Sequence, residues 1–171
     1  MDGVRYLPGR WQTDERGGFV RLLDDVSDAL TGATLAQVSL STNTLSGTLR
    51  GFHALARSAL EWKAVSCVRG EVFDVLLDCR PESATYMRSE SRTLGPANPG
   101  TLIIPPGVAH AYLTLSDHSW VLYGMSSPYD PNLEIGFRWN DPMLGISWPT
   151  APSILSAKDA AWPPLTSAPQ L

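Results

Sequence analysis

The chain has 171 residues, and its 13 Lys and Arg against 17 Asp and Glu give a formal net charge of -4. This length is typical of one domain, so we expect residues 1–171 to fold as a single domain. The acidic balance, without a basic run, argues against binding of nucleic acid, which depends on concentrated positive charge. No run of about 20 apolar residues and no signal-peptide core is present, so the sequence predicts a cytoplasmic protein without membrane contact.

Short apolar segments rich in β-branched and aromatic residues alternate with glycine and proline turn signals along most of the chain. This pattern is typical of an all-β sandwich or barrel and not of a helical bundle. We expect strands at 19–23, 35–42, 48–53, 62–68, 71–79, 101–104, 108–115 and 119–126.

Turn and capping residues divide these segments. The two-residue gap at Arg69-Gly70 predicts a tight hairpin, and Pro105-Pro106-Gly107 predicts another sharp turn. Asp24 or Asp25 is placed to cap a short helix that ends at Gly32. A second short helix is expected at 156–161, and the tail 166–171 is expected to be loose.

The alternation of side chains along three strands groups polar residues with apolar ones. One face of 108–115 carries His110, 119–126 carries Tyr123, and 62–68 carries Lys63. Burying such groups is costly without partners, so a barrel cavity lined by them would indicate a functional site and not a purely structural core. Alternation alone does not tell which face points inward.

The three histidines differ in their surroundings. His118 lies in a polar turn, and we interpret it as a solvated loop residue. His110 is equally compatible with a core histidine bonded to a neighbouring strand and with a role in holding substrate or a carboxylate. His53 follows Arg50 and Gly51, which are unusual neighbours for a packing residue, so we consider it a candidate catalytic base.

A set of acid–base groups follows from these residues. His53 as base, Tyr123 as acid, and Lys63 and Arg50 as fixed positive charges are the groups that proton abstraction next to a carbonyl requires. Asp74 and Asp159 are both candidates to orient His53. Because Arg50 and His53 are three residues apart, their facing one ligand requires a bulge near Gly51.

A metal site is the alternative to this set of acid–base groups. The run Pro105-Pro106-Gly107-Val108-Ala109-His110 is similar to the later metal-binding segment of the cupins, which are double-stranded β-helix (jelly-roll) barrels. In the earlier segment, however, His53 is followed by Ala54 and Leu55, without a second histidine. Two histidines are too few for the usual ligand cage. We therefore expect a cupin-type fold with neither metal nor cofactor.

Several runs, in order from about Asp14 to Pro164, resemble the nucleotide-sugar epimerases typified by dTDP-4-dehydrorhamnose 3,5-epimerase. Each run is weak alone, and together they are specific. They are Asp14-Glu15-Arg16-Gly17, Leu49-Arg50-Gly51-Phe52-His53, Gly70-Glu71-Val72-Phe73-Asp74-Val75, Ile104-Pro105-Pro106-Gly107-Val108-Ala109-His110, Tyr129-Asp130-Pro131 through Glu134, Trp139-Asn140-Asp141-Pro142, Ile146-Ser147-Trp148-Pro149 and Leu155-Ser156-Ala157-Lys158-Asp159.

The resemblance implies a metal-free cupin isomerase that forms a homodimer by exchanging N-terminal strands. It implies His53 as general base with Asp159 as its carboxylate, Tyr123 as general acid, and Lys63 at the enolate oxygen on C4. Its substrate would be a dTDP-linked 4-keto-6-deoxyhexose, inverted at C3, C5 or both. The positions implied to hold nucleotide and sugar, with Tyr129 stacking on thymine, are Arg16, Gln37, Arg50, His110, Tyr129, Glu134 and Lys158.

The sequence departs from the family pattern close to these positions. An aromatic residue and a glutamine usually follow the base, where this chain has Ala54 and Leu55, and Glu61 replaces a glutamine before Lys63. Arg21 and Ser39 replace a usual acidic residue and an asparagine. Two alternatives therefore stay open: a C3-only or C5-only epimerase of a secondary-metabolite pathway, and a cupin that binds nucleotide sugars without turnover. A metal-dependent cupin is a third reading, which lacks ligands here.

Overall fold

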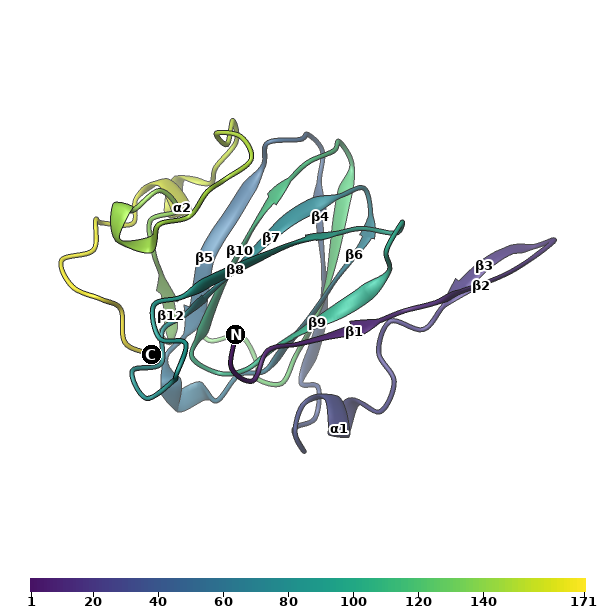
Figure 1. The fold of residues 1–171 in the computed structure, drawn as a ribbon, viewed down its shortest axis with the longest axis horizontal. Helices are drawn as coiled ribbons and strands as arrows, with labels where there is room; N and C mark the ends of the chain where they lie inside the picture. Colours follow the sequence, from purple (N-terminus) through teal and green to yellow (C-terminus); the bar gives the residue numbers. More distant parts are fainter.

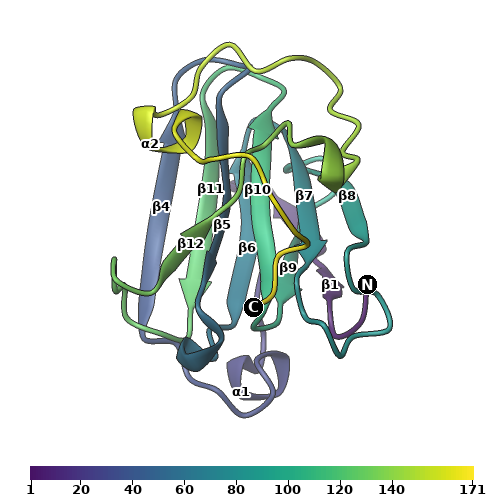
Figure 2. The same cartoon turned by 90° about the vertical axis from the view of Figure 1, so that its left-hand side faces the viewer.

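Two five-stranded antiparallel sheets face each other in the computed structural model, which describes residues 1–171 apart from the side chain of Arg57 (Figures 1 and 2). In spatial order, the first sheet contains β1 (Arg5–Pro8), β9 (Gly100–Ile104), β6 (Lys63–Arg69), β11 (Ser119–Met125) and β4 (Gln37–Asn43). The second contains β12 (Glu134–Gly136), β5 (Leu49–Leu55), β10 (Val108–Thr114), β7 (Val72–Asp78) and β8 (Ser89–Leu94). The predicted all-β class is confirmed.

The remaining elements lie outside the two sheets. Strands β2 (Trp11–Asp14) and β3 (Gly17–Val20) form a two-stranded arm that projects from the body (Figure 1). The helical elements are α1 (Val26–Ala29), η1 (Arg57–Ala59), η2 (Pro142–Leu144) and α2 (Ala157–Ala160). Among the residues that the structure describes, no helix is long and apolar enough to cross a membrane.

Four strands were not expected from the sequence. β1 and β12 are only four and three residues long, and β8 is polar and exposed along most of its length because it lies at the edge of its sheet. β2 belongs to the arm, where all four residues are exposed. Its partner β3 ends at Val20, so the strand expected at 19–23 begins and ends earlier than predicted. These four strands bury no regular face and so lack the alternating pattern on which the prediction depends.

The prediction of a hairpin at Arg69-Gly70 is wrong. The turn is as tight as predicted, but β6 and β7 belong to different sheets and are not hydrogen-bonded to each other. The turn at Pro105-Pro106-Gly107 likewise carries the chain from β9 to β10, across the sandwich. Sequence distance limits the length of a connection but does not determine whether the joined strands pair.

The main core lies between the sheets and determines which strand faces point inward. Apolar side chains from both sheets form one buried cluster, namely Val65, Cys67, Val72, Leu76, Leu94, Leu102, Ile104, Val108, Tyr112 and Val121. Val65 and Cys67 share their face of β6 with Lys63, Val108 and Tyr112 share theirs with His110, and Val121 shares its face with Tyr123. The polar residues that alternation grouped together therefore belong to the inward faces.

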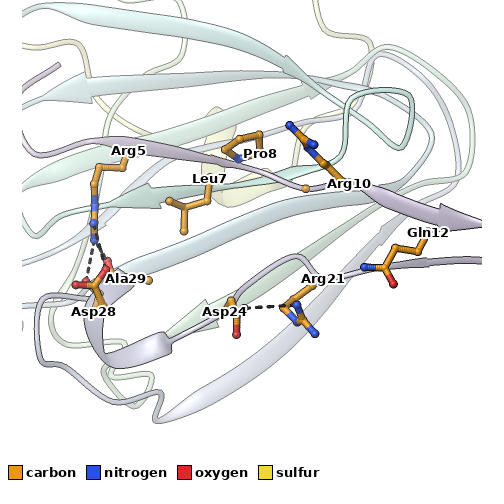
Figure 3. Close-up of a pocket in the computed structure, with 10 residues that line it drawn as sticks. Arg5, Leu7, Pro8, Arg10, Gln12, Arg21, Asp24, Asp28 and Ala29 are labelled. Atoms are coloured by element: carbon orange, nitrogen blue, oxygen red, sulfur yellow. Dashed lines mark hydrogen bonds and ion pairs between the residues drawn. The ribbon is translucent and has the colours of Figure 1, made fainter.

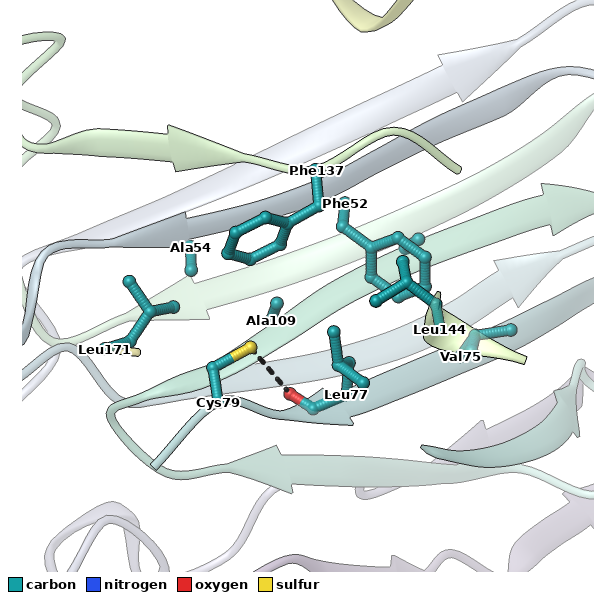
Figure 4. Packing of buried hydrophobic residues seen from close by; sticks show 10 residues of the cluster. Phe52, Ala54, Val75, Leu77, Cys79, Ala109, Phe137, Leu144 and Leu171 are labelled. Carbon is teal, nitrogen blue, oxygen red and sulfur yellow. Dashed lines mark hydrogen bonds between the residues drawn. The ribbon is translucent and has the colours of Figure 1, made fainter. Parts of the chain in front are cut away.

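A second apolar cluster covers the outer face of the sheet that contains β5, β10 and β7 (Figure 4). The C-terminal third of the chain supplies its covering residues Phe137, Leu144 and Leu171. The backbone N–H of Leu171 also donates to the carbonyl of Cys79 over 2.8 Å. The tail expected to be loose is thus packed, because its last side chain completes an apolar cluster.

Both predicted helices are present, and each is shorter than expected. The side chain of Asp25 accepts a hydrogen bond from the N–H of Asp28 over 3.1 Å, which caps α1. Ser156 caps α2 by accepting the N–H of Asp159 over 3.0 Å. Such caps satisfy backbone donors that the first turn leaves free. The second cap also holds Asp159 against β5, which α2 contacts.

Candidate active site

A cavity of about 180 Å³ opens between the two sheets and collects most of the predicted catalytic groups. Strands β5, β6, β10, β11 and β12 and the loops beside them supply its walls. The lining residues are His53, Ala54, Leu55, Glu61, Lys63, His110, Tyr123, Met125, Tyr129 and Glu134.

His53 and Asp159 form a hydrogen-bonded pair at one wall of the cavity. Nε2 of His53 lies 2.6 Å from Oδ1 of Asp159, whose residue is only 3% exposed. Burial acts to raise the pKa of Asp159, but the hydrogen bond and charge of His53 outweigh burial and lower it. The carboxylate therefore stays ionised, and its contact with Nε2 leaves Nδ1 as the nitrogen that can accept a proton. Of the two carboxylates that the sequence left open, Asp159 is the one that orients His53.

The expected bulge in β5 is present and brings His53 to the cavity. His110 and Tyr112 of β10 pair with His53 and Arg50, so two steps along β10 correspond to three along β5. Gly51 lies at this irregularity with φ +109, and its peptide bond to Phe52 is cis. The N–H of Gly51 donates to Oδ2 of Asp159 over 3.3 Å. The bulge thus positions both His53 and Asp159.

Tyr123 lies on β11, across the sandwich from β5, and its ring meets the ring of His110 edge-on at 5.9 Å. Burial raises the pKa of the Tyr123 hydroxyl well above its usual value, and Tyr112 and the Asp74 carboxylate add to the rise. The hydroxyl is therefore protonated at neutral pH, which is the state in which it can donate a proton.

Lys63, at the start of β6, is the ammonium group that lines this cavity, and its side chain is 12% exposed. Nζ lies 2.5 Å from Oε2 of Glu61, a residue that is itself 7% exposed. From the sequence, Glu61 is a departure from the family pattern and not a predicted site residue. The available signal was the spacing of two residues from Lys63, which puts both side chains on one face of an extended segment.

His110 is held by the other candidate carboxylate. Its Nε2 lies 2.7 Å from Oδ2 of Asp74 on β7, and both residues are at most 5% exposed. Of the two interpretations left open for His110, the structure shows features of both: it is a buried histidine bonded to a neighbouring strand, and it lines the cavity.

The cavity mouth carries a chain of polar contacts. The hydroxyl of Tyr129, which is 62% exposed, donates to Oε2 of Glu134 over 2.9 Å, and Lys158 of α2 forms an ion pair with the same carboxylate. Burial acts to raise the pKa of Glu134, but the hydrogen bonds from Lys158 and Tyr129 lower it overall. An aromatic ring beside a cation at an open mouth suits a ligand with a flat base and phosphates.

Four predicted binding residues lie outside the cavity lining, and of these Lys158 forms an ion pair with the lining residue Glu134. The other three are Arg16, Gln37 and Arg50. Arg16 is at the tip of the arm, exposed and paired with Asp14 at 2.5 Å. Gln37 of β4 reaches Sδ of Met125 over 3.4 Å, so it supports a lining residue. Arg50 donates to Oδ1 of Asn43 over 2.9 Å. The structure therefore joins eight of the eleven predicted residues at the cavity or directly behind it, through the contacts given above.

A larger hollow of about 420 Å³ lies at the base of the arm (Figure 3). Arg5 there donates to the backbone carbonyl of Asp28 over 3.0 Å, and Arg21 lies 3.5 Å from Asp24. The histidine and tyrosine side chains needed for proton transfer line the smaller cavity instead. In the part of the chain that the structure describes, no group of three or more His, Cys, Asp or Glu side chains is arranged to hold a metal ion.

Comparison with known proteins places this geometry in a family. The profile of dTDP-4-dehydrorhamnose 3,5-epimerase matches residues 1–167. The enzyme of that name from Methanothermobacter thermautotrophicus is 35% identical over 173 residues, covering 99% of this chain and 93% of that protein. A dTDP-4-dehydrorhamnose 3-epimerase of Streptomyces niveus is 34% identical, covering 93% and 78%. The solved 3,5-epimerase of Legionella pneumophila, in complex with dTDP-4-keto-L-rhamnose, has a TM-score of 0.89 at 30% identity, covering 100% and 95%.

Proposed function

The chain belongs to the dTDP-4-dehydrorhamnose 3,5-epimerase family of cupin-fold isomerases, and we propose that it inverts C3 and C5 of a dTDP-linked 4-keto-6-deoxyhexose. The observation that carries the proposal is the meeting of three groups in one cavity. These are His53 with its buried carboxylate, the ammonium group of Lys63, and the protonated hydroxyl of Tyr123. Together they supply a base, an electrostatic stabiliser and an acid.

The first step is removal of the proton next to the ketone. Nδ1 of His53 accepts the proton from C3 or C5, and the Asp159 carboxylate at Nε2 stabilises the imidazolium that forms. The electron pair of the C–H bond moves into the ketone and makes an enolate, whose oxygen on C4 accepts a hydrogen bond from Lys63. A fixed positive charge at that oxygen lowers the barrier because the negative charge develops there.

The second step returns a proton from the opposite side. Tyr123 comes from the sheet that faces His53, so its hydroxyl can protonate the other face of the enolate carbon. Inversion follows because the proton leaves toward one sheet and arrives from the other. Proton exchange with solvent then restores Tyr123 and His53 for the next turnover.

The nucleotide would lie at the cavity mouth. Tyr129 offers a ring for the base, and Lys158 and Arg50 offer cations for the diphosphate, in keeping with the solved relative that holds dTDP-4-keto-L-rhamnose. Arg16 is far along the arm, so it would reach a nucleotide only in the cavity of another copy.

We propose accordingly that the protein is a homodimer with exchanged N-terminal strands. The arm carries Trp11 and Phe19, which are 46% and 59% exposed, and the outer face of edge strand β4 carries Val38 and Leu40, which are 64% and 51% exposed. Burying these apolar side chains against a second copy would remove them from water. It would also supply Arg16 to the partner's site.

A second candidate is inversion at C3 alone. The Streptomyces niveus relative is a 3-epimerase, and this chain has Ala54 and Leu55 on the cavity wall directly after the base. Smaller side chains there would leave the sugar more freedom, so that one of its two acidic carbons could stay out of reach of His53.

The test is proton NMR of dTDP-4-keto-6-deoxyglucose with the enzyme in D2O. Deuterium entering at both C3 and C5 is expected, and His53→Ala should abolish it. His118→Ala is the matched control, because His118 is exposed in a turn and should leave exchange unchanged. Exchange at C3 alone would select the second candidate. Binding without exchange at either carbon would refute catalysis on this substrate.

A further inference from the structure

A second carboxylate stands beside the lysine of the cavity. Glu61 is 7% exposed and lines the same cavity as Lys63, His53 and Tyr123. Its Oε2 is 2.5 Å from Nζ of Lys63, with which it forms an ion pair. Apart from this contact, no residue that the structure describes donates a hydrogen bond to Oε2. The ion pair occupies one side of the carboxylate, which keeps further lone pairs that can accept a hydrogen bond.

Stability alone is a poor reason for a carboxylate at this place. A buried ion pair costs desolvation that its attraction often fails to offset, and the neighbouring wall is already apolar, with Ala54, Leu55 and Met125. For a simple ketone, a carboxylate beside Lys63 would also oppose the negative charge that develops on the enolate. Both costs fall if the ligand itself brings a hydrogen-bond donor to Glu61.

On the basis of the function proposed above, we propose that Glu61 is a specificity-determining residue that, with Lys63, recognises an α-hydroxy ketone. The two side chains present a donor and an acceptor next to each other. A ketone carbon beside a hydroxyl-bearing carbon presents the complementary pair, an acceptor and a donor. Lys63 donates to the C4 oxygen while the C3 hydroxyl donates to the carboxylate of Glu61.

This pairing predicts selection against sugars that lack the hydroxyl. Without that donor, the Glu61 carboxylate has only Lys63 as a partner, and its charge opposes the negative charge that develops on the enolate. A site that hydrogen-bonds a substrate hydroxyl discriminates strongly against the analogue that lacks it. The analogue loses a hydrogen bond, and the polar group of the protein loses its partner as well.

The experiment compares two substrates on each variant. The rate of deuterium entry at C5 is measured for dTDP-4-keto-6-deoxyglucose and for its 3-deoxy analogue, and kcat/KM gives the preference. We expect Glu61→Ala to reduce the preference by about 10- to 100-fold relative to the unaltered protein. Glu61→Gln, which keeps an acceptor oxygen, should retain part of it. The preference is the ratio of the two kcat/KM values on one variant, so a loss of folded enzyme cancels. Comparing this ratio between variants also cancels the difference in intrinsic acidity between the two sugars.

Glu134→Gln is the matched control, since Glu134 is the other carboxylate of the same cavity but is bonded to Tyr129. Glu134→Gln should slow deuterium entry into both substrates by the same factor and so leave the preference unchanged. An unchanged preference in Glu61→Ala, or an equal loss of preference in Glu134→Gln, would overturn the role of Glu61 while the epimerase function stands. If the unaltered protein exchanges neither sugar, the proposed function fails, and this inference with it.

Discussion

At the scale of single residues, the candidate site depends on two histidine–carboxylate pairs with different surroundings. His53 is partly open, with 36% of its side chain exposed, whereas His110 is buried with its Asp74 partner. A base must reach substrate, so exposure toward the cavity favours His53 for proton removal. The closed pair of His110 and Asp74 instead packs beside Tyr123, whose ring meets that of His110 edge-on at 5.9 Å.

Replacing Tyr123 by Phe separates proton removal from inversion. The variant keeps the ring that packs on His110 but loses the hydroxyl that we assign as acid. His53 can still remove and return a proton on its own side, so deuterium should enter while the configuration is retained. We expect the rate of epimer formation to fall by about 10²- to 10⁴-fold. NMR in D2O measures both quantities in one sample, and epimer formed at the rate of the unaltered protein would exclude Tyr123 as the acid.

At the scale of elements, the bulge in β5 determines where the candidate base and its carboxylate lie. A regular strand would direct Arg50 and His53 to opposite faces. The extra residue at Gly51 interrupts this alternation, and the N–H of Gly51 also donates a hydrogen bond to the Asp159 carboxylate. One irregular position in a central strand thus determines the direction of the base and the location of its carboxylate.

Gly51→Ala should therefore damage both stability and activity. Gly51 has φ +109, and an added Cβ would lie 2.5 Å from the carbonyl oxygen of His110 and 2.8 Å from Cα of Ala111. We expect the free energy of unfolding to fall by about 2–5 kcal/mol, measured by urea denaturation.

Gly145→Ala is the control for that variant. Gly145 has φ +60, but nothing lies within 4 Å of its added Cβ, so only the backbone cost of about 1–2 kcal/mol applies. Equal losses in the two variants would mean that close packing at the bulge contributes little.

At the scale of the whole molecule, the arm and the cavity are separated within one chain. The arm projects from the body (Figure 1). Arg16 lies in the turn between β2 and β3, whereas the candidate catalytic groups line the cavity between the two sheets. In the dimer proposed above, the arm of each copy would bring Arg16 to the cavity of the other.

The dimer is tested by measuring mass with light scattering after size exclusion. We expect about twice the chain mass of 18.6 kDa. Phe19→Asp should shift the protein toward the monomer and slow epimerisation, because the charge opposes burial of the arm. Met143→Asp, at a residue 45% exposed in η2, should change neither. A monomeric mass for the unaltered protein would refute the dimer.

The sequence could predict the strands that bury one regular face, the acidic cap of the first helix and the bulge at Gly51. These features depend on spacing within a few residues: alternation for strands, a side-chain acceptor near free N–H groups for caps, and a three-residue separation for the bulge. The short, edge and arm strands β1, β2, β8 and β12 were missed because they have no alternating apolar face.

The sequence by itself determined the all-β class and, through ordered motifs, the family and its candidate catalytic residues. Only the tertiary structure decided that Asp159 and not Asp74 pairs with His53, that β6 and β7 lie in opposite sheets, and that Glu61 joins Lys63 in the cavity. The reason is physical: local pattern reports which groups a segment buries, but pairing between distant residues depends on how the two sheets close over their common core.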